Sequence, residues 1–141
     1  MCLSPTLIGR RPSDNLMIDL KIIDAVLNDR GSKYAVSGAV AHNKKEADAV
    51  LKALKKNKKF AKATHNTWAL LSSADGPVKN DDGESGAGMV ILRMLEREDL
   101  HDHIIIVTRW FGGTKLGGDR FRRVQDCVRA YLDDVKLDSS Y

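Results

Sequence analysis

The sequence is poor in cysteine and has no long hydrophobic run. Its two cysteines, Cys2 and Cys127, indicate neither a disulfide framework nor a zinc site, and they fit a reducing compartment. The longest apolar runs, GMVIL and IIIV, are far too short to span a bilayer. The N-terminus also lacks an apolar core of signal-peptide length. We therefore expect a cytoplasmic protein without membrane contact.

Length and composition predict one ordinary globular domain. The chain has 141 residues, of which 43% are hydrophobic and 30% are charged, and these values are typical of a protein with a real core. Proline, glycine and serine recur in the first 20 residues, and they predict a flexible tail over residues 1–20, followed by a single domain over 21–137. Two arginines and no acid before Asp14 leave an organelle-targeting signal open for this tail. The net charge of +4 permits an RNA or an acidic protein partner without requiring one.

Hydrophobic periodicity predicts four strands and three helices. Asn43 and Glu46 have the spacing of a helix cap, and HIIIVTR has the composition of a central strand covered on both faces. The expected fold is α+β, a two-layer, four-stranded mixed sheet with helices packed on it. In chain order the elements are strands 21–27 and 33–40, helix 42–60, strand 65–71, helix 85–98, strand 103–109 and a helix from 119.

Two loops with opposite charge are expected at one edge of this sheet. If strands 65–71 and 103–109 run parallel, the acidic loop after the first and the glycine-rich loop after the second leave the same edge. Glycines would shape the loops, ion pairs would hold them together, and aromatic residues and a lysine would meet a protein partner. The predicted partner-binding residues are Asp81, Asp82, Gly83, Glu84, Arg109, Trp110, Phe111, Gly112, Gly113 and Lys115.

Neither glycine segment matches a nucleotide-binding motif. GGTKLGGD lacks the Gly-Lys-Ser/Thr ending of a P-loop, and GAGMVI has isoleucine in place of the third dinucleotide-binding glycine. The helix start at 117–119, with Lys115 and Arg109 nearby, could hold an anion, which leaves a phosphate-handling enzyme as one hypothesis. The simpler interpretation is a tight turn that needs positive φ angles, with Asp119 capping the helix. We expect no cofactor.

Other chemistry-bearing side chains favour structural roles. The acids of the segment 81–84 lack the calcium-loop spacing, so a solvated acidic loop is preferred to a metal site. His65, His101 and His103 are all expected at the edge opposite the glycine loop, so no nucleophile–base pair can be assembled. We therefore expect no catalytic residue, and a protein without enzymatic activity.

Lysines concentrate in the segment 44–62, and arginines follow the glycine loop. This distribution supports an RNA- or ribosome-binding module as an alternative. Base-stacking aromatics are not interleaved with the lysines, which weakens the sequence-specific form of that alternative. The candidate nucleic-acid residues are Lys52, Lys55, Lys56, Lys59, Arg120, Arg122 and Arg123.

Three motifs in order resemble one family. KATHNTWAL, NDDGESGAG and VTRWFGGTKLG are together similar to the Impact family, the module shared by bacterial YigZ-like proteins and eukaryotic Impact proteins. The likeness runs from DRGSKY to CVRAYL, and GGDRFRRVQDCVR resembles the eukaryotic branch, with Gly118 where that branch has proline.

The resemblance implies a fold like the second domain of the small-subunit ribosomal protein five. It also implies a regulator of translation under amino-acid starvation, which binds the large ribosome-associated activator of the eIF2α kinase and so restrains that kinase. Association with actin is a further implied interaction, and RNA binding has been suggested for this fold. The expected function is therefore a non-enzymatic, protein-binding module of the stress response.

Overall fold

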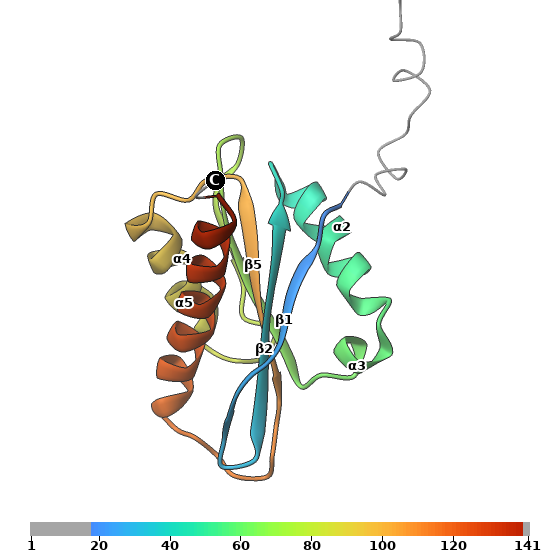
Figure 1. Ribbon diagram of the computed structural model, residues 1–141, viewed down its shortest axis with the longest axis vertical. Helices are drawn as coiled ribbons and strands as arrows, with labels where there is room; N and C mark the ends of the chain where they lie inside the picture. Colours follow the sequence, from blue (N-terminus) through green and yellow to red (C-terminus); the bar gives the residue numbers. More distant parts are fainter. Residues whose placement is uncertain (1–17, 140–141) are drawn as a thin grey trace, which may run out of the picture.

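A five-stranded sheet lies between two pairs of helices in the computed structural model, which describes residues 18–139 (Figure 1). The strand order is β1-β2-β5-β3-β4, and every neighbouring pair is antiparallel. Most of the expected tail, residues 1–17, lies outside the described residues. No helix between residues 18 and 139 is both long enough and apolar enough to cross a bilayer. The elements are β1 (Lys21–Asp29), β2 (Ser32–Val40), α2 (Lys44–Lys55), α3 (Lys58–Ala61), β3 (His65–Ser72), β4 (Gly76–Asn80), α4 (Ala87–Arg97), β5 (His103–Trp110) and α5 (Asp119–Ser139).

The α+β class is confirmed, but three details of the expected sheet are wrong. The sheet has five strands rather than four, because β4 forms inside the segment that was expected to be a polar loop. It is antiparallel rather than mixed, since β3 and β5 pair in opposite directions. It is also covered on both faces, so the protein has three layers and not two (Figure 1).

The first two strands form the expected hairpin. Asp29 pairs with Ser32, and the two turn residues, Arg30 and Gly31, have φ angles of 49° and 92°. Positive φ at both positions is the geometry of a type I′ turn, whose twist matches that of the strands. Farther along β1 the register shifts between Ile23 and Leu27, where a bulge interrupts the pairing with β2.

The lysine-rich helix is divided in two. Asn43 caps α2 by accepting from the backbone N–H of Glu46 at 2.9 Å, and the Glu46 carboxylate accepts from the backbone N–H of His42 at 2.8 Å. This arrangement confirms the predicted N-terminus. The predicted continuous helix to residue 60 is wrong, because α2 ends at Lys55 and Asn57 caps the separate helix α3.

Alternate residues of the central strands build two cores. Tyr34 and Val36 face α4 and α5, whereas Ala35 and Ala39 face α2 and α3. β5 lies in the middle of the sheet, and its isoleucines alternate between the two clusters. The expectation that HIIIVTR is a central strand covered on both faces is therefore confirmed.

Candidate functional site

The acidic and glycine-rich loops do meet at one end of the sheet. We call this place the loop end: the β1–β2 turn, the start of β3, the segment 81–86 and the segment 111–118. Because β4 runs antiparallel to β3, residue 81 emerges beside the start of β3, where His65 pairs with Arg109 near the end of β5. The β1–β2 turn and the chain after β5 lie together at the bottom of Figure 1. The predicted convergence is thus present, although it arises from an extra strand and not from parallel pairing.

A buried ion pair joins the two loops. One guanidinium nitrogen of Arg109 donates to both carboxylate oxygens of Glu84, at 3.1 and 2.9 Å. The side chains are only 6% and 7% exposed, and the Nε of Arg120 lies 3.6 Å from the same carboxylate. Breaking such a pair from one side leaves a buried charge without compensation. The pair therefore fixes the relative position of the two loops and does not itself reach a partner.

The same arginine holds the hairpin turn. Its Nε and second terminal nitrogen lie 3.3 and 3.2 Å from the hydroxyl of Ser32, which also accepts from the backbone N–H of Gly112 at 3.3 Å. A Cβ placed on Gly112 would lie 2.0 Å from the carbonyl carbon of Gly31. Glycine is required here because the backbones of the glycine loop and the hairpin turn are in direct contact.

The two neighbouring acids each have a structural partner. Asp81 accepts from the backbone N–H groups of Gly86 and Gly88 at 3.0 and 2.8 Å, and so caps the start of α4. Burial acts to raise the pKa of Asp81, but these two hydrogen bonds and the charge of Lys79 together outweigh it, and the pKa is lowered. Asp82 accepts from the backbone N–H of Asn66 at 2.7 Å. Within residues 18–139, no group of three or more His, Cys, Asp or Glu side chains is arranged to hold a metal ion.

His65 was assigned to the wrong edge. It begins β3, and in an antiparallel sheet that start lies at the loop end, where its Nδ1 is 2.8 Å from the carbonyl oxygen of Asp82. Its Nε2 is 3.9 Å from the Glu84 carboxylate. His103 does lie at the opposite end, where its Nε2 is 2.7 Å from the hydroxyl of Tyr131. Burial lowers the pKa of His103.

Trp110 lies on the other face of the sheet, beside α3, whereas the ring of Phe111 lies 5.6 Å from the Arg109 guanidinium. The indole N–H of Trp110 donates to the carbonyl of Lys59 at 3.0 Å, and its ring packs edge-on against Phe60 at 5.3 Å. The Lys59 ammonium lies 5.3 Å from the Trp110 ring centroid. Phe111 is 47% exposed, and its backbone N–H donates to the Thr64 hydroxyl at 2.8 Å. Thus Trp110 is largely a packing residue, while Phe111 presents its ring to solvent.

A groove of about 690 Å³ lies against these rings. Its walls are the bulge of β1, the start of β2, Lys59 of α3 and the aromatic pair at the end of β5. We call it the aromatic groove. Sequence reasoning missed it, because its walls come from four segments and the contact between Trp110 and Lys59 spans 51 positions.

The remaining glycine-loop features do not combine into the suggested anion site. Lys115 is exposed, but Arg109 is buried and its nitrogens already bind Glu84 and Ser32. Asp119 was expected to cap α5; instead its carboxylate accepts from Arg30 at 2.7 Å. Gly113 has a φ of 95°, which agrees with the expectation of a tight turn.

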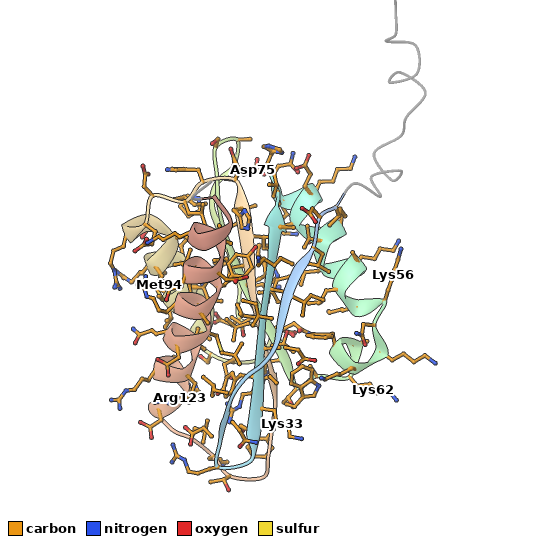
Figure 2. All side chains as sticks on the ribbon, in the orientation of Figure 1. Lys33, Lys56, Lys62, Asp75, Met94 and Arg123 are labelled. Atoms are coloured by element: carbon orange, nitrogen blue, oxygen red, sulfur yellow. The ribbon has the colours of Figure 1, made fainter. Side chains whose placement is uncertain are left out.

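The two basic sets proposed for RNA lie on opposite sides of the sheet. Figure 2 shows Lys56 and Lys62 on one side and Arg123 on the other. Lys52, Lys55 and Lys56 are exposed on the α2 side. On the α5 side, Arg120 lies beside Glu84, and Arg123 lies 3.2 Å from Asp126. The two sets therefore do not form one continuous basic face.

Comparison with known proteins gives a consistent result. Residues 30–132 match the model of the Impact N-terminal domain family. The chain is 36% identical over 116 residues to the protein IMPACT homolog of Caenorhabditis elegans, covering 77% of this chain and 45% of that protein. It is 34% identical over 119 residues to human protein IMPACT, covering 81% of this chain and 37% of that protein. The chain therefore spans less than half the length of these two relatives.

Two solved structures are also similar. A crystal structure of a hypothetical protein aligns with a TM-score of 0.58 and 22% identity, covering 84% of this chain and 59% of the other. That likeness supports the α+β fold alone. The structure of a two-domain translational regulator, Yih1, aligns with a TM-score of 0.47 and 29% identity, covering 77% of this chain and 44% of that one.

Proposed function

The chain belongs to the Impact N-terminal domain family, and on that basis we propose that it is a non-enzymatic, cytoplasmic module that regulates translation. In this proposal it binds the large ribosome-associated activator of the eIF2α kinase during amino-acid starvation. The kinase then receives less activation, so less eIF2α is phosphorylated. Actin is a further candidate partner by the same family resemblance.

The observation that carries this proposal is an exposed aromatic ring held on a rigid base. Phe111 is 47% exposed, and the residues on either side of it are fixed by close contacts. On one side Arg109 is held by Glu84, and on the other Gly112 contacts the β1–β2 turn. Aromatic residues that are positioned before binding act as anchors of protein interfaces because little side-chain freedom is lost. Lys115 is exposed four residues farther along the same loop.

The proposal is tested with purified activator and in starved eukaryotic cells. We expect Phe111→Ala together with Lys115→Ala to weaken binding of the activator about tenfold or more, as at an interface hot spot. Phosphorylated eIF2α should fall when the native chain is overproduced, and should not fall with the double variant.

Met89→Ala is the matched control, because Met89 is also an exposed large hydrophobic residue but belongs to α4. It should behave like the native chain in both measurements. Equal behaviour of the double variant and the native chain would contradict the assignment of this surface.

RNA binding is the second candidate, now restricted to the α2 side. Lys52, Lys55 and Lys56 have helical spacing, are exposed and form no ion pair within the described part of the chain. Three neutralised phosphates of a single strand give a slope of about −2 in log affinity against log salt concentration. Replacing the three lysines by glutamate should abolish this binding, whereas Arg122→Glu on α5 should not. Absence of binding at low salt would remove the candidate.

A further inference from the structure

The aromatic groove owes its shape to a strained bulge in an edge strand. Three residues of β1, 24–26, stand opposite one residue of β2, between the pairs Ile23–Val36 and Leu27–Tyr34. Ala25 has a φ of 52°, in the left-handed region that alanine rarely adopts. Strained backbone is concentrated at functional sites, and bulges bend an edge strand away from regular pairing. The bulge residues Asp24 and Ala25 and the following Leu27 line the groove.

The opposite wall combines aromatic surface with positive charge. Trp110 and Phe111 supply the rings, and Lys33 and Lys59 supply two ammonium groups. Lys33 is exposed and has no ion pair within the described residues. Asp24 is the single acid among the described residues that line the groove. The groove is therefore complementary to a ligand that carries both apolar and acidic groups.

Asp24 already demonstrates how a carboxylate binds here. Its Oδ2 lies 2.6 Å from the ammonium of Lys59, which in turn lies above the Trp110 ring. The Lys59 and Asp24 side chains are 53% and 46% exposed, so water reaches both. Exposed ion pairs contribute little net stability because solvent screens them. A carboxylate from another molecule can therefore replace that of Asp24 at small cost.

Building on the proposed function, we propose that the aromatic groove docks an acidic linear peptide segment of the partner protein. An apolar side chain of the peptide packs on Phe111 and Trp110. One flanking carboxylate binds Lys33, and another takes the place of Asp24 on Lys59. In the free protein Asp24 competes for this position, so it acts as a weak internal competitor.

The groove favours a peptide over nucleic acid. Two lysines, one of them already paired, are too few to follow a phosphate backbone, whose binding to single strands depends on a continuous positive groove. A volume of about 690 Å³ falls in the range of ligand pockets, which are mostly apolar with a few charged groups.

The test uses the purified chain and short fluorescent peptides in which glutamates flank one leucine or phenylalanine. We expect binding by fluorescence anisotropy, with shifts of the Trp110 indole N–H and of residues 24–27 in NMR spectra. Phe111→Ala and Lys33→Glu should each weaken binding about tenfold, as loss of an anchor does. Asp24→Asn should tighten it by up to about fivefold, which is the most that an exposed ion pair typically contributes. Met89→Ala should change nothing.

Each other result overturns the inference. The inference is contradicted if the native chain binds no peptide. It is also contradicted if Phe111→Ala and Lys33→Glu both leave binding unchanged, or if Asp24→Asn weakens binding. Binding of a single-stranded RNA oligonucleotide at the same resonances in place of the peptide would also contradict it. The proposed function is tested separately. Peptide binding with the expected pattern, but without an effect on phosphorylated eIF2α, would contradict the proposed function and still support the peptide-binding groove. If the Phe111 variant loses activator binding but the native chain binds no peptide, the proposed function is supported and the peptide-binding groove is contradicted.

Discussion

Two carboxylate–cation pairs lie on opposite faces of the sheet near the loop end, and they differ in burial far more than in distance. Glu84 and Arg109 are 2.9 Å apart with side chains 7% and 6% exposed. Asp24 and Lys59 are 2.6 Å apart with side chains 46% and 53% exposed. The shorter contact is the weaker one, because water competes for both of its partners. The buried pair therefore holds the loops in place, and the exposed pair is available for exchange.

The largest expected effect comes from removing half of the buried pair. Glu84→Ala leaves the Arg109 guanidinium buried without its carboxylate, and it also removes the carboxylate that faces Arg120. We expect a loss of about 3–5 kcal/mol in the free energy of unfolding, measured by urea denaturation. Glu96→Ala, at an exposed position of the nearby helix α4, should cost less than about 1 kcal/mol. If the two variants lose equal stability, the buried pair of Glu84 with Arg109 does not stabilise the fold.

The second-largest effect is expected from a substitution at the close backbone contact between the glycine loop and the β1–β2 turn. Gly112→Ala would place a Cβ 2.0 Å from the carbonyl carbon of Gly31, so the glycine loop and the β1–β2 turn must move apart. We expect a destabilisation of about 1–3 kcal/mol, as for overpacking, in urea or thermal unfolding.

Gly118→Ala is the matched control for this close contact. Gly118 lies in the same loop and has no positive φ, and no atom of residues 18–139 would lie within 4 Å of an added Cβ. Its replacement should change the free energy of unfolding by less than about 0.5 kcal/mol. A neutral Gly112→Ala would mean that the turn and the loop are not in contact.

The sequence identified the loop end through two errors that cancel. Parallel pairing of the strands 65–71 and 103–109 was assumed, whereas the strands are antiparallel. The strand β4 was also missed, and it carries the chain back so that Glu84 still reaches Arg109. Opposite charge in the two loops was the dependable signal, because buried charges need partners wherever the topology places them.

Strand β4, the position of His65 and the contact of Trp110 with Lys59 could not be predicted from the local sequence pattern. β4 contains both glycine and Pro77, which predict a turn, and proline is tolerated there because β4 is an edge strand. His65 was placed at the wrong end by the same missing reversal. Phe60 stands among the lysines in the sequence but is buried in the core, whereas Trp110, which is distant in sequence, lies against Lys59 in the fold. Contacts between distant segments depend on strand order, which periodicity does not determine.

The partly buried His103 gives a third effect, at the other end of the sheet. Burial lowers the pKa of His103, so near the ordinary histidine pKa of about 6.5 the unfolded chain binds a proton that the folded chain does not. Stability from this residue is therefore present above that pH and is lost as the pH falls below it.

His103→Gln removes this titration while keeping a polar side chain near Tyr131. Urea unfolding at pH 7 and pH 5 should show a smaller loss of stability in the variant than in the native chain. Other groups titrate equally in both proteins, so the difference belongs to His103. An identical loss would mean that His103 takes up its proton equally readily in the folded and the unfolded chain.

The smallest effect completes the comparison of the two ion pairs. Asp24→Asn breaks the pair with Lys59 but retains a side-chain oxygen that can accept from the backbone N–H of Ala25, as Asp24 does at 2.8 Å. Because both partners are about half exposed, the free energy of unfolding should change by less than about 1 kcal/mol, and even less at high salt. Urea denaturation at low and high salt measures this. A loss as large as that of Glu84→Ala would mean that the β1 bulge depends on Asp24 for its structure, and that the carboxylate is not free to exchange with one from a partner.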